Sequence, residues 1–327
     1  MKGHCNNRQD TDAKRGESAK RVDVLVDTLA KLSADGDKLL TEYMSSAKQN
    51  MEKWALEATD SARKKSGDAT VEVRVIEGDS LLTTRYFTEL YGETFVVLNM
   101  ANAFSVGGGV KFGAAAQEEN LFRRSSCLLQ LRPVEVKRNP DGSLKDPSKY
   151  TRTSSALING KNDVVELDVD KPRVCVKGAE DKAHPALGYE WLAAEEAFLW
   201  YEMRAAAVHY PKPNPTNWDR AEAKKRIKAQ FATMRAKGKK FAILSAFGCG
   251  AFNQPGDKVA QVYKEVIEEE KAGFAGGALI FAIISPYGPQ NQHMFAQVLS
   301  PTGQPEKLEE LAPITSTSST STTSCNC

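Results

Sequence analysis

The 327-residue sequence predicts an α/β fold in which helices cover both faces of a mostly parallel sheet. Short apolar runs, each suited to a buried strand, alternate along the chain with longer segments whose apolar residues recur every three or four positions. Glycine-containing turns separate the two kinds of segment. Hydrophobic residues make up 41% of the chain and charged residues 26%, as in an ordinary globular protein that can bury a sizeable core.

The N-terminal region divides into a polar segment and a helical one. Residues 1–18 are polar and charged, and we expect them to be disordered. Residues 19–68 are expected to form a helical extension that packs on the core, because Val22, Leu25, Leu29 and Leu32 share one helical face.

The remaining elements follow in the order that an α/β core requires. Strands are expected at residues 71–75, 94–100, 173–176, 241–244 and 278–284. Helices are expected at residues 188–208, 217–236 and 257–271. Residues 131–171 are polar and predict a long surface excursion. We expect the catalytic domain to span residues 69–300 and the Ser/Thr-rich tail, residues 301–327, to be disordered.

Charge, cysteines and histidines limit the classes of function. The formal net charge is only +2, so attraction to a polyanion would need a local patch. The six cysteines form no C-x-x-C pair and the four histidines show no metal-ligand spacing, so we expect no metal and no cofactor. The sequence contains neither a membrane-length apolar run nor a signal peptide. We expect an intracellular protein without a membrane partner, and the cytoplasm and nucleus both stay open.

The stretch from Phe95 to Cys127 carries the most chemical information. An apolar strand leads into Asn99, then three glycines, Gly107 to Gly109, then seven residues and the triplet Gln117-Glu118-Glu119. Ligands of open α/β sheets bind beyond the carboxyl ends of strands, and this loop leaves such an end. Glycines let the backbone approach a ligand and present N–H groups to phosphates. The two glutamates also have an ordinary explanation, since acidic residues are favoured in the first turn of a helix. From residue types alone, both interpretations stay open.

A second loop follows the strand at 241–244 and contains Gly248-Cys249-Gly250-Ala251-Phe252. Its backbone, together with the start of the next helix, could bind an anion. Cys249 could be a nucleophile, but no histidine is near it in sequence, which favours a small loop residue. Phe252 could stack on a sugar or anchor the core.

Two further features are ambiguous by themselves. Asp79 follows the first strand and could accept a hydrogen bond from an adenine amino group, although aspartates are common in turns. The basic residues of segment 220–240 could track a polyanionic polymer, but a solvated helix face is the more frequent explanation.

The two loops and the Gly78-Asp79 turn together resemble the microbial-type poly(ADP-ribose) glycohydrolase (PARG) family of the macrodomain superfamily. The family signature, GGG followed after six to eight residues by QEE, is similar to Gly107–Gly109 and Gln117–Glu119 here. Leu98-Asn99-Met100-Ala101 looks like the family's L-N-F-A, and residues 246–252 look like its A-W-G-C-G-V-F. Two departures stand out: Val106 replaces the usual proline before GGG, and residues 176–180 bring charges near the expected adenine side.

The resemblance implies a macrodomain-like three-layer α/β/α sandwich with a mixed, mostly parallel sheet and an N-terminal helical extension. It also implies roles at the matching positions. Glu119 would be the general acid/base and Glu118 would hold ribose hydroxyls. The residues that would line the ADP-ribose site are Asp79, Asn99, Gly107, Gly108, Gly109, Val110, Gln117, Gly248, Cys249, Gly250, Ala251 and Phe252. Among these, the two glycine loops would wrap the diphosphate, Phe252 would pack on the distal ribose and Asp79 would face the adenine.

The expected activity is hydrolysis of the ribose–ribose bonds of poly(ADP-ribose), with ADP-ribose as the product. The substrate would be the polymer or an ADP-ribosylated protein, and we expect a monomer. Removal of mono-ADP-ribose from protein or nucleic acid is the neighbouring alternative, and a non-catalytic ADP-ribose reader is a third interpretation. A nucleotide-dependent oxidoreductase is disfavoured because no G-x-G-x-x-G follows the first strand.

Overall fold

The computed structural model describes residues 3–58, 70–131, 149–211, 217–284 and 290–312. Over these residues, one mixed sheet has the strand order β3-β5-β2-β6-β7-β1-β8, with β4 pairing to β5. Every pair is parallel except the two that β3 and β4 form with β5. The strands are β1 (Glu72–Glu77), β2 (Val96–Met100), β3 (Glu166–Leu167), β4 (Arg173–Cys175), β5 (Phe198–Ala205), β6 (Phe241–Leu244), β7 (Ala278–Ile283) and β8 (Glu306–Lys307).

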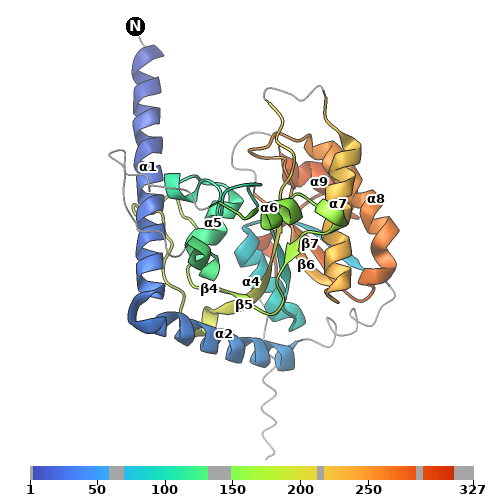
Figure 1. The fold of residues 1–327 in the computed structure, drawn as a ribbon, viewed down its shortest axis with the longest axis horizontal. Helices are drawn as coiled ribbons and strands as arrows, with labels where there is room; N and C mark the ends of the chain where they lie inside the picture. Colours follow the sequence, from blue (N-terminus) through green and yellow to red (C-terminus); the bar gives the residue numbers. More distant parts are fainter. Residues whose placement is uncertain (1–2, 59–69, 132–148, 212–216, 285–289, 313–327) are drawn as a thin grey trace, which may run out of the picture.

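The α-helices lie on both sides of this sheet (Figure 1). They are α1 (Gly3–Leu32), α2 (Lys38–Glu57), α4 (Ser80–Tyr91), α5 (Gln117–Arg124), α6 (Arg152–Ile158), α7 (Arg220–Ala236), α8 (Gly256–Glu270) and α9 (Asn291–Leu299). Short 3-10 turns connect them, including η2 (Val110–Phe112) between the glycine triplet and α5.

The sheet separates two hydrophobic cores, as the alternation of side chains along β2 shows. Val97 belongs to the core shared with α1, α2, α4 and α5, whereas Val96 and Leu98 belong to the core shared with α7, α8 and α9. The predicted three-layer α/β/α arrangement with a mostly parallel sheet is confirmed.

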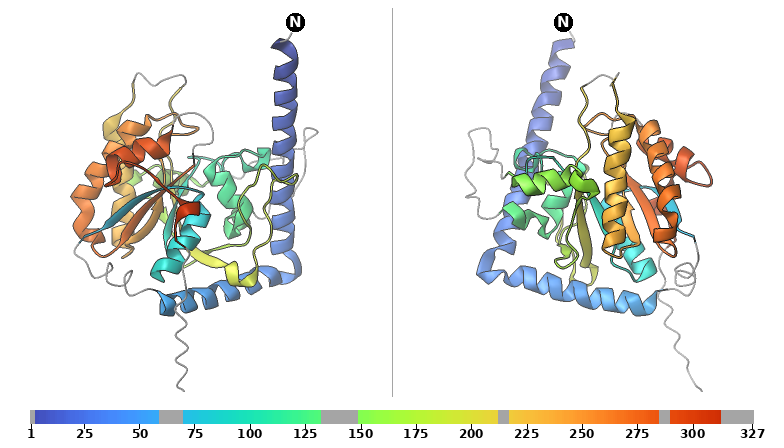
Figure 2. Two further views of the ribbon diagram at one scale, coloured as in Figure 1. Left: turned by 180° about the vertical axis from the view of Figure 1, so that it is seen from behind. Right: turned by 45° about the vertical axis from the view of Figure 1, so that its right-hand side comes forward.

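The N-terminal helices form an L along the side of the molecule opposite α7 and α8 (Figures 1 and 2). Val22, Leu25 and Trp54 are buried in the core that α4 and α5 share. The sequence predicted disorder through residue 18, but α1 begins at Gly3. The buried second half of α1 provides a helical nucleus, from which adding each further residue costs little.

Three other predictions also differ from the structure. The expected helix at 188–208 is wrong, because β5 occupies Phe198–Ala205 and is buried on both faces; a continuous apolar run cannot distinguish a strand from a helix. The tail was expected to be disordered from residue 301, yet β8 pairs with β1. The surface excursion at 131–171 contains α6 and β3; its residues 132–148 and the tail residues 313–327 lie outside the described residues.

Among the described residues, no helix is both long and apolar enough to cross a membrane.

Candidate active site

A cavity of about 840 Å³ opens at the carboxyl ends of β1, β2, β6 and β7. This is where open α/β sheets bind ligands, and the volume lies within the range of roughly 300–1,000 Å³ usual for small-molecule sites. The predicted residues that line it are Asp79, Gly108, Gln117, Glu118, Glu119, Gly248, Cys249, Gly250, Ala251 and Phe252. The structure thus brings together two motifs that are more than 100 residues apart in the sequence.

Glu118 and Glu119 lie at the centre of this arrangement, in the first turn of α5. They are 4% and 7% exposed. Glu118 Oε2 accepts a hydrogen bond from the backbone N–H of Asn102 at 2.7 Å, and Glu119 Oε1 accepts one from that of Gly109 at 2.7 Å. Both carboxylates are therefore held by the glycine-rich loop, and neither serves as the N-cap of its own helix. This geometry disfavours the ordinary explanation for acidic residues at a helix start.

Each carboxylate also keeps one oxygen without a partner. Within the described residues, Glu118 Oε1 and Glu119 Oε2 are buried and form no hydrogen bond. Buried polar atoms in proteins are nearly always hydrogen-bonded, and an unbonded one at a cavity surface marks a place for a ligand group. Hydroxyl groups of a bound sugar would satisfy both oxygens.

The middle glycine of the triplet allows the two carboxylates to come this close to the loop. Gly108 has a φ of +54°, in the left-handed region that favours glycine. A Cβ at this position would stand 2.6 Å from Glu118 Oε2 and 2.6 Å from Glu119 Oε1. The glycine therefore gives the pair space as well as backbone freedom.

Burial makes ionisation of Glu118 unfavourable. The pKa of Glu118 is raised well above its usual value, first because burial removes solvent from the carboxylate and second because the Glu119 carboxylate is adjacent. The hydrogen bond from Asn102 offsets part of this effect. Glu118 thus retains a proton at pH values where an exposed glutamate has lost its own.

Gln117 anchors the start of α5 rather than presenting its amide to a ligand. Its Oε1 accepts from Met100 N at 3.0 Å, and its Nε2 donates to Leu98 O at 2.7 Å. Both bonds are to the end of β2. The side chain therefore fixes the first turn of the helix, and with it the glutamate pair, to the sheet.

The two glycine loops differ in the N–H groups that they can offer. In the first loop, Gly108 N donates to Ser105 O and Gly109 N donates to Glu119, so these groups are already occupied. In the second loop, the N–H groups of Gly250, Ala251 and Phe252 have no acceptor among the described residues. The second loop and the start of α8 thus offer more N–H groups to an anion than Gly108 and Gly109 do.

Cys249 and Phe252 fill different roles in the second loop. The Cys249 thiol is buried, and burial raises its pKa, so it stays protonated and is a poor nucleophile. Phe252 is half-buried at the cavity, where its ring meets His209 edge-on with a centroid distance of 5.5 Å. The ring is thereby oriented to pack on a ligand.

Asp79 is already engaged by the protein through one carboxylate oxygen. Its Oδ1 caps α4 by accepting from Leu81 N and Leu82 N, at 3.0 and 2.9 Å. The same oxygen accepts from Arg124 Nη1 at 2.7 Å. Asp79 lines the cavity, so only its other oxygen is available to a base.

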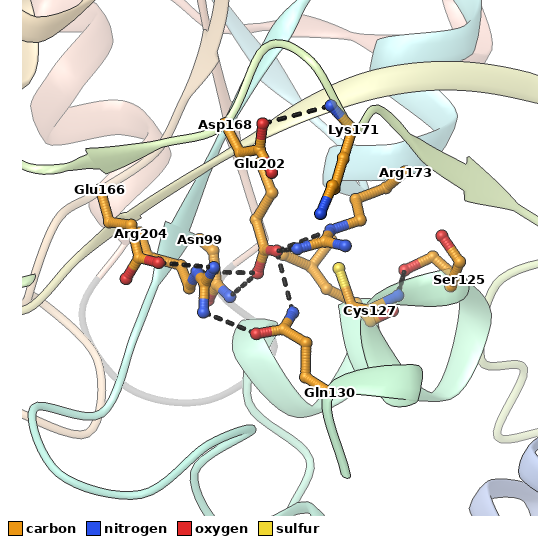
Figure 3. A network of polar contacts seen from close by, with 12 residues as sticks. Asn99, Ser125, Cys127, Gln130, Glu166, Asp168, Lys171, Arg173, Glu202 and Arg204 are labelled. Atoms are coloured by element: carbon orange, nitrogen blue, oxygen red, sulfur yellow. Dashed lines mark hydrogen bonds and ion pairs between the residues drawn. The ribbon is translucent and has the colours of Figure 1, made fainter. Parts of the chain in front are cut away.

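Asn99 does not line the cavity. Its side chain is fully buried and donates to Glu202 Oε1 at 2.8 Å, within the polar network of Figure 3. Arg173 and Gln130 both donate to Glu202 Oε2, at 2.9 and 3.0 Å. Burial alone would raise the pKa of Glu202, but the nearby arginines Arg204 and Arg173 lower it overall. Asn99 therefore belongs to a buried ion-pair network behind the site, and its predicted contact with the sugar is not what the structure shows.

Three other predicted residues also stand behind the cavity wall. Gly107 packs against Phe122, Gly109 binds Glu119, and Val110 is fully buried in the core. The sequence reasoning assigned no role to Asn102 or Asn291. Both line the cavity: Asn102 lies two residues beyond the end of β2, and Asn291 is the first residue of α9. The position of Asn102 beyond a strand end was the signal that could have identified it.

The charges expected near the adenine side face the N-terminal helix instead. Glu180 accepts two hydrogen bonds from Arg21 of α1, and Lys177 lies 3.8 Å from Asp27 of the same helix. Neither Lys177 nor Glu180 lines the cavity.

The basic face of α7 is paired with acidic residues of α8. Lys224 contacts Glu265 and Glu269, and Lys228 contacts Glu269 at 3.0 Å. This pairing favours a solvated ion-pair surface over a binding surface for a polyanion.

Among the described residues, no group of three or more His, Cys, Asp or Glu side chains could hold a metal ion.

Comparison with known proteins finds one matching family model. Residues 19–150 match the model of the microbial-type PARG catalytic domain. Over this segment the chain is similar to the microbial-type PARG family. The matched segment includes the GGG and QEE motifs, and it begins inside α1 and crosses the domain boundary expected at residue 69.

Solved structures agree on the fold. The chain is similar to PARG from Thermomonospora curvata bound to the inhibitor ADP-HPD, with 21% identity, a TM-score of 0.53 and coverage of 85% of this chain and 98% of that one. A second structure of the same bacterial PARG gives 20% identity, a TM-score of 0.51 and the same coverage. No protein with curated function matched the chain. The matched family model is the one that the sequence motifs indicated, and it supports the expected class of enzyme, a poly(ADP-ribose) glycohydrolase.

Proposed function

We propose that this protein hydrolyses the ribose–ribose O-glycosidic bonds of poly(ADP-ribose) and releases ADP-ribose, with Glu119 as the single acid/base. The observation that carries the proposal is the buried Glu118–Glu119 pair at the cavity, in which each carboxylate is fixed by a loop N–H and keeps one oxygen without a hydrogen-bond partner. The family match supports poly(ADP-ribose) as the substrate, and the structurally similar PARG from Thermomonospora curvata binds the inhibitor ADP-HPD.

The geometry divides the work between the two carboxylates. Glycosidases usually place two carboxylates on opposite sides of the scissile bond, but these two are adjacent and flank one glycine. One carboxylate therefore positions the sugar while the other transfers the proton. Glu118, whose raised pKa favours the protonated form, can both donate to and accept from ribose hydroxyls.

Glu119 performs the chemical step. As an acid it gives a proton to the leaving ribose oxygen while the glycosidic bond breaks and an oxocarbenium-like centre forms. As a base it then takes a proton from the water that attacks this centre, which returns the carboxyl group to its starting state. The N–H of Gly109, at 2.7 Å from Oε1, keeps the group oriented through both halves of the reaction.

The remaining lining residues supply binding. The free N–H groups of residues 250–252 would receive the diphosphate, Phe252 the distal ribose, and the open oxygen of Asp79 the adenine. We further propose that the protein acts as a monomer and that its substrate is poly(ADP-ribose) or an ADP-ribosylated protein.

Incubation of the purified protein with defined poly(ADP-ribose) and with a mono-ADP-ribosylated protein tests the proposal. The expected result is release of free ADP-ribose from the polymer, with little release from the mono-modified protein. Release from the mono-modified protein alone would favour the mono-ADP-ribosyl hydrolase interpretation. Binding of both substrates without any cleavage would favour a reader.

A further inference from the structure

The N-terminal helix is connected to the catalytic helix by a buried chain of hydrogen bonds. Arg21 of α1 binds Glu180 with two bonds, from Nε at 3.0 Å and from Nη2 at 2.7 Å. Tyr189 Oη donates to the same carboxylate, at Oε2, at 2.5 Å. Arg123 of α5 donates to Tyr189 Oη from Nε at 2.9 Å. The Tyr189 hydroxyl therefore joins the Arg21–Glu180 pair to α5 by hydrogen bonds, beside a longer direct ion pair of 4.0 Å between Arg123 Nη2 and Glu180 Oε2.

The chain ends on the wall of the cavity. Arg123 Nη1 donates to Ala114 O at 2.8 Å, and Ala115 and Ala116, the next two residues, line the cavity directly before α5. Tyr189 Oη also lies 3.4 Å from Nδ2 of Asn120, which lines the cavity one residue after Glu119. The network thus holds both ends of the segment that carries the glutamate pair.

The backbone around Tyr189 is strained. Leu187, Gly188 and Tyr189 are consecutive residues with φ of 63°, 67° and 62°, in the left-handed region that residues other than glycine rarely adopt. Such strain persists only where the surrounding contacts enforce it, and it concentrates at functional sites. Here it turns a 2% exposed tyrosine inward, so that its hydroxyl reaches two charged groups.

The helix α1 supports this arrangement at a second point. A Cβ on Gly113, which directly precedes Ala114, would stand 2.0 Å from Ser18 O of α1. The N-terminal helix therefore contacts the loop between η2 and α5 through its backbone as well as through Arg21.

We propose that Tyr189 is a positioning residue for Glu119, and that Arg21 of the N-terminal helix acts through it. Tyr189 lies outside the cavity lining and does not meet the substrate. Its effect is to fix the segment 114–120, so that the catalytic carboxylate stays aligned with the leaving oxygen. This inference rests on the proposed glycohydrolase activity.

The substitution Tyr189→Phe tests the inference, because it removes one oxygen and keeps the ring that lies 5.6 Å from the Arg123 guanidinium. We expect kcat on poly(ADP-ribose) to fall about tenfold, since small misplacements of a catalytic group cost this much or more. The Kd for ADP-ribose should stay within about threefold, because no binding contact is lost. Arg21→Gln should lower kcat in the same direction, and Arg21→Lys should restore part of it.

Tyr43→Phe is the matched control. The Tyr43 hydroxyl of α2 donates to Leu192 O at 2.7 Å, so the variant also removes one hydrogen bond between an N-terminal helix and the 176–192 segment. It leaves the connection to α5 intact. We expect a lower Tm without a change in kcat.

The outcomes are separable. Equal kcat values for Tyr189→Phe and Tyr43→Phe, or a loss of ADP-ribose affinity that accounts for the whole effect, would overturn the positioning role. If Tyr189→Phe does not fold, the kcat values of Arg21→Gln and Arg21→Lys are compared with that of Tyr43→Phe by the same criteria. A wild-type protein that fails to cleave the polymer would instead refute the proposed function.

Discussion

The substitution Gly108→Ala perturbs the site at the point where both carboxylates meet the loop. Alanine adds a single carbon and no charge, so its effects come only from space and backbone conformation. The new Cβ would stand 2.6 Å from Glu118 Oε2 and from Glu119 Oε1, and the φ of +54° disfavours any side chain.

The structure gives a magnitude for each effect. An ordinary contact requires 3.4 Å or more, so both carboxylates must retreat from 2.6 Å. A displacement approaching 1 Å at a catalytic group costs on the order of 100-fold in rate. A non-glycine residue in the left-handed region costs about 1–3 kcal/mol, which lowers the Tm of a chain this size by roughly 2–4 °C.

Steady-state release of ADP-ribose from the polymer, together with a thermal unfolding curve, measures both effects. Gly238→Ala is the matched control, because its φ of +62° carries the same backbone cost, a Cβ there meets nothing within 4 Å, and Gly238 does not line the cavity. We expect Gly238→Ala to keep kcat within about threefold and Gly108→Ala to lose about 100-fold. A Gly108→Ala variant with the kcat of the control would refute the placement of the two carboxylates.

Three further predictions follow from the site and its surroundings. Because the pKa of Glu118 is raised in the folded protein, the folded state keeps a proton that the unfolded state releases above about pH 4.5. Glu118 therefore lowers the free energy of unfolding as pH rises from there. In thermal scans, Glu118→Gln should have a higher Tm than wild type at neutral pH, and this advantage should disappear near pH 4.5. Cys249→Ala should keep most of the activity, because the buried thiol is protonated, and a loss of about 1,000-fold would indicate a nucleophile. The double variant Lys224→Gln/Lys228→Gln should leave the KM for polymer and its salt dependence unchanged, because both lysines are paired with acidic residues of α8. A weaker salt dependence in the double variant would instead indicate that the basic face of α7 binds the polymer.

Periodicity and motif spacing predicted much of the fold and the site. The alternation of apolar runs with helical segments located β1, β2, β6, β7, α7 and α8, and the strand ends located the two glycine loops. This succeeded because parallel strands bring their carboxyl ends to one edge of the sheet, whatever their separation in sequence.

The errors have physical causes. The strand β5 was taken for a helix because its eight residues are buried on both faces and carry no period. Asn99 was assigned to the sugar side because the family resemblance implied it, whereas its side chain donates to Glu202, whose charge it helps to stabilise. Side-chain direction at a strand end depends on pairing register, and the sequence does not contain that information locally.

The Tyr189 connection was beyond sequence reasoning for a similar reason. The connection joins three segments with no shared motif, which supply Arg21, Arg123, and Glu180 with Tyr189. The backbone at residues 187–189 also has a conformation that non-glycine residues rarely adopt. Only the folded chain brings the four side chains into contact.

The central claim is that Glu119 transfers the proton, and one comparison tests it most directly. Turnover of defined poly(ADP-ribose) is measured for wild type and Glu119→Gln, together with the Kd of each for ADP-ribose. The amide keeps the size of the side chain and the acceptor for Gly109 N–H, but it cannot donate and retake a proton. We predict a loss of at least about 1,000-fold in kcat with ADP-ribose binding within about threefold of wild type. Substantial turnover by Glu119→Gln would contradict the assignment.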